Sequence, residues 1–223
     1  MNTKALVAEF IGTFTLIFIG VGAIASNVMS GNMLGLTGIA LAHGLAIGVM
    51  VSATAAVSGG HLNPAVTFGA LVTGKIDIKN GIGYIVAQCL GGIVAAYAIK
   101  LAIPEQALVA TNFGLPVVTR GITVLEAFST ETILTFFLVF VVFGTAIDKR
   151  APKVGGLFIG LAVAMGVMMG GAVSGAAMNP ARHLGPAIAG GGFENIWLYW
   201  AGPLLGGALA GFVYKYGLGE KES

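Results

Sequence analysis

Six long apolar stretches alternate with short polar connections along the chain. Each is about 20 residues long or longer, which is the length that a helix needs to cross the hydrocarbon core of a membrane. The pattern therefore predicts six membrane-spanning helices, at about 5–26, 35–57, 81–103, 122–147, 154–173 and 196–214.

Two further apolar segments, at about 63–73 and 179–189, are too short to span a membrane, and each begins with Asn-Pro-Ala. Proline is favoured at the first position of a helix, and asparagine just before it is a good N-cap. Short apolar helices in a chain with many spans are typically half-helices buried within the protein. We therefore expect two half-helices that enter the membrane from opposite sides and meet near its midplane.

Composition agrees with a membrane protein. Hydrophobic residues make up 57% of the 223 residues and charged residues only 9%, against about 25% in a soluble domain. This composition excludes a water-soluble globule and a disordered chain. A net charge of +2 gives no case for nucleic-acid binding, and Cys89, the single cysteine, excludes an internal disulfide and a multi-cysteine metal site. No nucleophile–base or metal constellation indicates an enzyme, and we expect neither a cofactor nor a metal.

The first apolar stretch also has features of a cleaved signal peptide. Lys4 supplies a positive start, and Ala23-Ile24-Ala25 resembles a cleavage site. Against cleavage stand Glu9 inside the apolar run and the echo of this stretch in the second half of the chain. We expect it to be the first span.

The chain repeats itself. Segment 57–65, VSGGHLNPA, matches segment 173–181, VSGAAMNPA, and Glu9 and Glu131 stand at corresponding places upstream. Each half holds three spans, an odd number, so the second copy must enter the membrane from the opposite side. We expect a single transmembrane domain over residues 1–223, built from two inverted repeats at about 1–105 and 120–217.

Lysine and arginine predict the orientation, because they are enriched on the cytoplasmic side. With both termini inside, eight of them lie on the inner side and three on the outer side. The sequence therefore predicts cytoplasmic termini. The inner set is Lys4, Lys75, Lys79, Lys149, Arg150, Lys153, Lys215 and Lys221, and the outer set is Lys100, Arg120 and Arg182.

The chain resembles an aquaporin of prokaryotic type, within the major intrinsic protein family. The resemblance covers essentially the whole chain and is carried by Ala8-Glu9-Phe10, SGGHLNPAVT at 58–67, and NPAR at 179–182 with Gly185-Pro186. It implies an all-α membrane protein, an aquaporin-like right-handed bundle of six transmembrane helices plus two re-entrant half-helices. It also implies a multi-pass protein of the cell membrane and a homotetramer with one pore per subunit.

The resemblance further implies a passive water channel in the lipid bilayer that passes some small neutral solutes and excludes ions and protons. The alternative within the family is a facilitator of glycerol, ammonia or urea. Outside the family, a secondary transporter is the rival, because inverted repeats also build transporters.

The two triplets are the candidate pore centre: Asn63, Pro64 and Ala65, and Asn179, Pro180 and Ala181. By resemblance, the two asparagine amides donate hydrogen bonds to a water oxygen, and carbonyls of about 59–62 and 175–178 accept hydrogen bonds from water. Two positive helix ends that point at one place also raise the energy of a cation there.

Counting from the triplets, the resemblance places a selectivity filter at His43, Val167, Ala176 and Arg182. Strict water channels have phenylalanine at the His43 position and histidine at the Val167 position. Val167 and Ala176 are small, so we expect a wider filter, closer to those of plant vacuolar-membrane aquaporins. His183, after the arginine, fits neither water channels nor glycerol facilitators.

Glu9 and Glu131 are acidic residues inside predicted spans. A carboxylate in a membrane is a functional candidate, often for proton coupling. The family resemblance instead implies that each accepts hydrogen bonds from the backbone of a re-entrant loop, which needs internal partners. We expect this bracing role.

Overall fold

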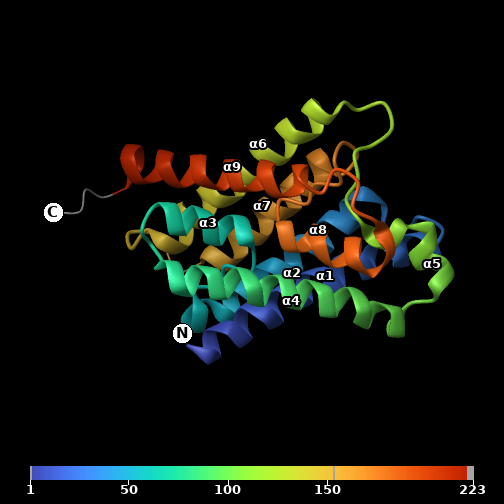
Figure 1. Ribbon diagram of the computed structural model, residues 1–223, viewed down its shortest axis with the longest axis horizontal. Coiled ribbons are helices and arrows are strands. Elements are labelled where there is room, and N and C mark those ends of the chain that lie inside the picture. The colour runs from blue at the N-terminus through green and yellow to red at the C-terminus, as the bar shows by residue number, and fades with distance from the viewer. Residues whose placement is uncertain (1, 153, 220–223) are drawn as a thin grey trace.

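The computed structural model describes residues 2–152 and 154–219, and no strand occurs within them. Six long helices form a bundle in this part of the chain, and α9 ends at the same end of the bundle where α1 begins (Figure 1). The long helices confirm the predicted all-α architecture. They are α1 (Thr3–Met29), α2 (Gly35–Ser58), α4 (Ile78–Ala102), α6 (Val124–Val142), α7 (Gly155–Gly170) and α9 (Leu198–Val213).

The two half-helices are α3 (Pro64–Val72) and α8 (Pro180–Pro186). They lie among the long helices, with α3 toward one end of the bundle and α8 toward the other (Figure 1). The second predicted segment, at about 179–189, is not one regular helix. Its α-helical part ends at Pro186 and a π-helical turn, η3, follows over Ala187–Gly191.

Four of the long helices, α1, α2, α4 and α6 with its extension, are long and apolar enough to cross a membrane by length and composition. The helices α7 and α9 are shorter, with 16 residues each. Two spans continue into π-helical turns, α6 into η2 (Phe143–Ile147) and α9 into η4 (Tyr214–Leu218).

The connection between α4 and α6 contains structure that the hydrophobic pattern did not predict. A short helix, α5 (Glu105–Ala110), and a 3-10 turn, η1 (Asn112–Gly114), lie there. Both are too short to give a helical period of their own. They lie at the end of the bundle opposite to the start of α1 (Figure 1).

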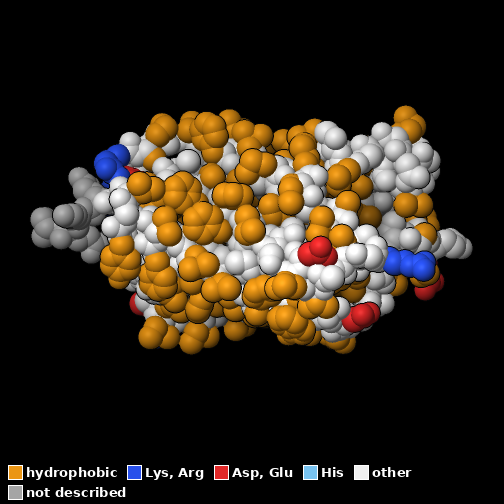
Figure 2. Space-filling view, turned by 90° about the horizontal axis from the view of Figure 1, so that it is seen from above, with side chains coloured by type: hydrophobic (Ala, Val, Ile, Leu, Met, Phe, Trp, Pro, Cys, Tyr) orange, Lys and Arg blue, Asp and Glu red, His pale blue; other side chains and the backbone are white. Residues whose placement is uncertain are grey.

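The outer surface of the bundle is apolar. Figure 2 shows one face on which hydrophobic side chains cover most of the area, while lysine and arginine side chains lie toward its two ends. Exposed side chains such as Leu45, Val49, Leu157 and Leu161 belong to this apolar surface. Such a surface suits contact with lipid or with other apolar helices.

Each half-helix packs against the last span of the other repeat. A Cβ placed on Gly207 of α9 would lie 2.6 Å from the carbonyl oxygen of Ala65 in α3. Likewise, a Cβ on Gly92 of α4 would lie 2.7 Å from the carbonyl oxygen of Ala181 in α8. The close approach of these backbones requires glycine, and it binds each half-helix to the opposite half of the chain.

Candidate functional site

The two asparagines of the triplets begin the half-helices. Asn63 has an extended backbone, and its Oδ1 accepts a 2.8 Å hydrogen bond from the N–H of Ala65. Asn179 does the same for α8, because its Oδ1 accepts from the N–H groups of Ala181 at 3.0 Å and Arg182 at 3.3 Å. Proline follows each asparagine at the first helical position, as the capping argument predicts.

The same two asparagines also link the two loops to each other. The Nδ2 of Asn63 donates to the carbonyl oxygen of Met178 at 2.8 Å, and the Nδ2 of Asn179 donates to that of Leu62 at 3.0 Å. Each amide nitrogen carries two hydrogens, so one N–H per asparagine is used in this exchange and one remains for another acceptor. The carbonyls of Leu62 and Met178 are the last in the two stretches expected to accept hydrogen bonds from water. Each therefore already accepts a hydrogen bond from an asparagine.

The backbone before each half-helix adopts matching strained conformations. Leu62 and Met178 both have a φ of 50°, and Ala176 has a φ of 45° at the place where Gly60 has 63°. Residues other than glycine rarely occupy this left-handed region, and each such residue costs free energy. The loops therefore depend on surrounding contacts to hold their shape.

Glu9 supplies those contacts for the first loop. Its Oε1 accepts hydrogen bonds from the hydroxyl of Ser58 at 2.6 Å and the N–H of His61 at 2.9 Å. Its Oε2 accepts from the N–H of Leu62 at 2.6 Å and the Nε2 of Gln88 at 2.7 Å. The carboxylate is completely buried, so these four donors take the place of water.

Glu131 holds the second loop in the same way. It accepts from the hydroxyl of Ser174 at 2.6 Å and from the N–H groups of Ala177 at 2.9 Å and Met178 at 2.7 Å. Its side chain is also completely buried. This arrangement favours a bracing role for both glutamates, because their oxygens are occupied by loop donors.

Sequence reasoning did not identify several further residues that support the loops. The hydroxyl of Tyr84 donates to the carbonyl of Ser58 at 2.9 Å, and that of Tyr199 donates to the carbonyl of Ser174 at 2.8 Å. Gln88 is the fourth donor to Glu9. The matching positions of the two tyrosines in the repeats were the signal that could have revealed their role.

One narrow cavity brings together both asparagines and all four residues of the expected filter. Its volume of about 20 Å³ is enough to hold a water molecule but little more. Apolar side chains form most of the remaining wall. The lining residues are Leu16, His43, Ile47, His61, Asn63, Val66, Leu138, Ile159, Val163, Val167, Ala176, Ala177, Met178, Asn179 and Arg182.

Arg182 and His43 are the polar side chains of the expected filter. Arg182 is 3% exposed, and its Nη1 has no hydrogen-bond partner among residues 2–152 and 154–219. His43 comes from α2, and its Nδ1 lies 2.9 Å from the carbonyl oxygen of Ile39. Because a carbonyl only accepts, Nδ1 carries the hydrogen and the neutral ring has its lone pair on Nε2. Val167 of α7 and Ala176 of the second loop add only small apolar groups.

His183 stacks on Tyr199, with ring centroids 4.1 Å apart and an angle of 14° between the rings. It occupies the position that Thr67 has in the first repeat, four residues after the asparagine. Neither ring nitrogen has a hydrogen-bond partner in the described part of the chain. The stacked ring fills the space beside Tyr199 and thereby supports the tyrosine that holds Ser174.

Two lysines bind the outer ends of the half-helices. The Nζ of Lys215 donates to the carbonyl of Thr73, the C-cap of α3, at 2.9 Å. The Nζ of Lys100 donates to the carbonyl of Ala189 in η3, beyond the end of α8, and lies 5.0 Å from the ring centre of Phe113. A cation at the C-terminal end of a helix is favourable, because that end carries partial negative charge.

These lysines stand at matching positions, and each holds the half-helix of the other repeat. Lys100 and Lys215 are 115 residues apart, as are Tyr84 and Tyr199. Sequence reasoning assigned both lysines to the orientation of the spans alone. Their equal spacing to the tyrosine pair was the available signal for a second role.

Comparison with known proteins agrees with this geometry. A family model described as "Major intrinsic protein" matches residues 1–214. The chain is 46% identical over 225 residues to a "Probable aquaporin TIP-type" of Antirrhinum majus, covering 96% of this chain and 86% of that protein. It is 43% identical over 231 residues to "Probable aquaporin TIP3-2" of Arabidopsis thaliana, with 96% and 84% covered.

The fold is also similar to a solved structure, the aquaglyceroporin from Plasmodium falciparum. The TM-score is 0.84 at 26% sequence identity, with 97% of this chain and 96% of that chain covered. These relatives are eukaryotic, so the expected prokaryotic type stays a prediction. The family match over nearly the whole chain and the plant relatives place the chain in the major intrinsic protein family.

Proposed function

We propose that this chain, an aquaporin-family membrane channel and not an enzyme, conducts water in single file through the cavity that Asn63 and Asn179 line. The observation that carries this proposal is the meeting of two half-helix N-termini at one narrow cavity, each with an asparagine amide that keeps one free N–H. Water moves passively along the osmotic gradient. The relatives are named aquaporins, and the solved neighbour is named an aquaglyceroporin.

The two asparagine amides explain how protons are excluded. A water oxygen that accepts a hydrogen bond from both amides has its lone pairs occupied, so it cannot accept a proton from its neighbour in the file. Asn63 and Asn179 are held in place by their bonds to the opposite loops. The two positive helix ends add an electrostatic barrier to any cation.

The remaining wall keeps the water file narrow and loosely bound. Apolar side chains such as Leu16, Val66 and Val163 offer no hydrogen bonds. Backbone carbonyls that precede the half-helices supply acceptors on the other side. Water is therefore bound strongly enough to replace its hydration partners and weakly enough to leave.

We assign the selectivity filter to His43, Val167, Ala176 and Arg182. The buried Arg182 guanidinium repels cations, and its Nη1 is available to a permeating oxygen. Because Val167 and Ala176 are small, the filter also admits small neutral solutes. A facilitator with glycerol, ammonia or urea as its main cargo is the second candidate, and the small size of these two side chains favours it.

We further propose one channel domain with two inverted repeats, about 1–105 and 120–217, set in the cell membrane with cytoplasmic termini. The matched contacts of Glu9 and Glu131 support the repeat. Homotetrameric assembly with one pore per subunit follows from the family resemblance, and the apolar outer surface is compatible with it. Mass measurement of the purified protein in detergent tests the tetramer directly.

Purified protein in lipid vesicles tests the function. An impermeant osmolyte shrinks the vesicles at a rate that reports water flow by stopped-flow light scattering. Re-swelling in glycerol, urea or ammonia reports solute entry. Shrinkage no faster than in empty vesicles would contradict the water channel, and solute entry that saturates and requires a sodium or proton gradient would point to a transporter.

A further inference from the structure

Gly20 of α1 lies against the Nε2 tip of the His43 ring. A Cβ placed on Gly20 would lie 2.7 Å from the Cδ2 of His43, 3.0 Å from its Cε1 and closer still to its Nε2. Real Cβ atoms do not approach side-chain atoms so closely. The tip of the imidazole therefore occupies the space that a side chain at position 20 would fill.

The ring is held at its other side by its own helix. The Nδ1 of His43 donates to the carbonyl oxygen of Ile39, one turn earlier in α2, at 2.9 Å. With Nδ1 anchored there, the Nε2 side of the ring points toward α1. His43 is thus fixed between a hydrogen bond on α2 and a recess on α1.

This recess opens on the pore side of α1. Leu16, one helical turn before Gly20, lines the pore cavity, and residues four apart lie on the same face of a helix. Both Gly20 and His43 are buried. A ring pushed out of the recess has the cavity that His43 lines as the open space beside it.

The second repeat has no such recess. Eleven residues after the bracing glutamate, the first repeat has Gly20 and the second has Val142. Twenty residues before the triplet asparagine, the first repeat has His43 and the second has Ile159. The pairing of a glycine with a polar ring is therefore particular to the end of the pore that holds Arg182.

We propose that Gly20 is a positioning residue for solute selectivity, because it lets His43 withdraw toward α1 and so sets the width of the filter. The inference rests on the proposed function and extends it to a residue that does not itself touch the solute. In this view, the Gly20–His43 pair determines whether neutral solutes larger than water can pass the filter. Water, which is smaller, depends on this width less.

The test is a mutant cycle in lipid vesicles with three neutral solutes of increasing size: ammonia, urea and glycerol. Gly20→Ala pushes the ring into the pore and is expected to lower permeability to the largest solute that the wild type passes by about tenfold, the scale of one methyl group in a tight pocket. Water permeability is expected to change much less. Gly22→Ala is the matched control on the same helix, because its Cβ would meet only Ile99 Cδ1 at an ordinary 3.5 Å.

The mutant cycle also includes His43→Ala and the double variant that combines it with Gly20→Ala. Once the ring is absent, the added methyl group has nothing to displace, so the two single effects should not add. An equal loss of solute permeability in both backgrounds would overturn the inference. An unchanged ratio of solute to water permeability in Gly20→Ala would overturn it as well.

A further double variant tests the inference even if Gly20→Ala folds poorly. Gly20→Leu in the His43→Ala background places a bulky side chain on α1, where the ring has been removed, and it should pass less solute than His43→Ala alone. Equal permeability of these two variants would contradict the inference. Wild-type water flow reports the proposed function separately, while a wild type that passes water and none of the three solutes would overturn the inference alone.

Discussion

The side-chain amide of Asn63 donates a 2.8 Å hydrogen bond to the carbonyl oxygen of Met178, which lies 115 positions further along the chain. Asn179 donates in the same way to the carbonyl oxygen of Leu62, so a reciprocal pair of hydrogen bonds joins the two loops at the proposed pore centre. The same two side chains cap their own half-helices. Each asparagine therefore caps its own half-helix and also binds the opposite loop.

Asn63→Asp should destabilise the protein and reduce water permeability. The aspartate keeps an acceptor for the N–H of Ala65 but replaces the donor to Met178 with an oxygen, which faces a carbonyl in a buried place. A lost buried hydrogen bond of this kind costs about 1–3 kcal/mol. Thermal unfolding in detergent and vesicle shrinkage measure the two effects.

Asn32→Asp is the matched control for this change. Asn32 is exposed, and its Oδ1 accepts a bond from Asn27 Nδ2, a role that aspartate preserves. We expect its unfolding temperature to match the wild type. Equal behaviour of Asn63→Asp and Asn32→Asp would show that the exchange between the loops contributes nothing.

Glu131→Gln should lower stability and distort the second loop. The substitution replaces one acceptor oxygen with an N–H₂ group that faces loop donors at Ser174, Ala177 or Met178. The expected loss is about 1–3 kcal/mol for each buried group left without a partner. Thermal unfolding measures the loss.

Glu126→Gln provides the comparison on the same helix. Glu126 belongs to an exposed capping box with Thr123, so its replacement by glutamine should destabilise the protein much less than Glu131→Gln. A Glu131→Gln variant of unchanged stability that acquires an altered response to a proton gradient would instead support proton coupling.

Arg182→Val should raise the leak of protons or cations while the protein still folds. The guanidinium is buried at the cavity, and its Nη1 makes no hydrogen bond within the described residues, so its loss removes positive charge without breaking a bond of that nitrogen. A barrier lowered by about 1.4 kcal/mol gives a tenfold faster leak. A pH-sensitive dye inside vesicles measures proton entry.

Two further variants test whether the charge at position 182 itself forms the barrier. Arg182→Lys keeps the charge and should leak less than Arg182→Val. Arg120→Val removes a charge from an exposed position outside the cavity and should behave as the wild type. A leak in Arg182→Val no greater than in the wild type would count against Arg182 as the barrier.

Lys215→Met should loosen the first half-helix and Lys100→Met the second. Each change removes a charged donor from a carbonyl at the outer end of a half-helix. We expect each to cost about 1–2 kcal/mol, from one charged hydrogen bond and the helix dipole. Hydrogen exchange at α3 and α8 would show which half-helix each variant affects.

Lys79→Met, at an exposed position in the first turn of α4, serves as the control for these two variants. The expected result is crossed: the lysine of the second repeat protects α3, and that of the first repeat protects α8. Faster exchange in the half-helix of the same repeat would contradict the prediction.

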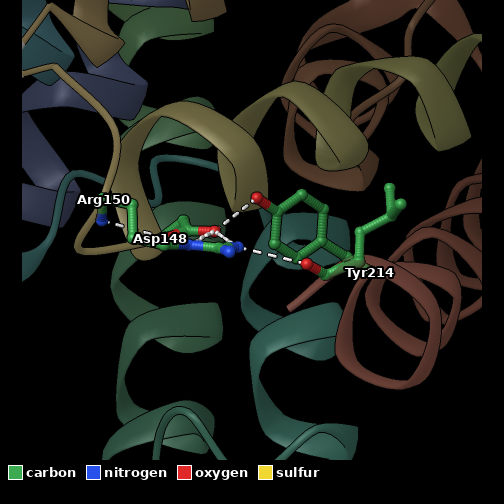
Figure 3. Close-up of polar contacts among 4 residues, drawn as sticks. Asp148, Arg150 and Tyr214 are labelled. Carbon is green, nitrogen blue, oxygen red and sulfur yellow. Dashed lines mark hydrogen bonds and ion pairs between the residues drawn. The ribbon is translucent and has the colours of Figure 1, made fainter. Parts of the chain in front are cut away.

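Asp148 should make the stability of the folded protein decrease at acidic pH. Figure 3 shows its carboxylate between Arg150 and the hydroxyl of Tyr214, which donates to it at 2.7 Å. The side-chain hydrogen bonds from Arg150 and then Tyr214 hold the pKa of Asp148 well below its usual range. Because the folded-state pKa is lowered, this cluster stabilises the protein above the usual aspartate pKa, and the contribution is lost as pH falls through the lowered value.

Unfolding temperatures measured from pH 6 down toward pH 2, where carboxylates titrate, test this cluster. Asp148→Asn should flatten the acid limb of the profile, and Tyr214→Phe, which removes one of the two donors, should flatten it in part. Glu194→Gln, at an exposed site on another loop, should leave the profile unchanged. An acid limb in Asp148→Asn as steep as in the wild type would contradict the assignment.

The hydrophobic pattern predicted the six long helices and two half-helices because each is a run of apolar residues with clear ends. The Asn-Pro-Ala triplets predicted where α3 and α8 begin, since capping depends on neighbours in sequence. The sequence did not predict α5, which is a helix of only six residues, or the π-helical turn after Pro186. Boundaries there depend on contacts with other parts of the chain.

The residues of the candidate site were likewise predicted only in part. The repeat brought Glu9, Glu131 and the triplets to attention, because each has a partner of the same type in the other half. Gln88 has no such partner, since Pro203 stands at the corresponding position, and nothing in the pattern singled it out. The contact of Gly20 with His43 joins two helices through space, and a glycine gives no sign of what occupies the volume it leaves.

The crossed arrangement of the lysines has a consequence for the order of biosynthesis. The first half-helix, α3, is complete by residue 72, yet the glycine it packs against and the lysine that binds its end are Gly207 and Lys215. The ribosome makes these residues only after α4, α6 and α7. The part of the fold around α3 therefore reaches its final form only after α9 and Lys215 have been made, and a chain truncated before α9 leaves α3 without its partner.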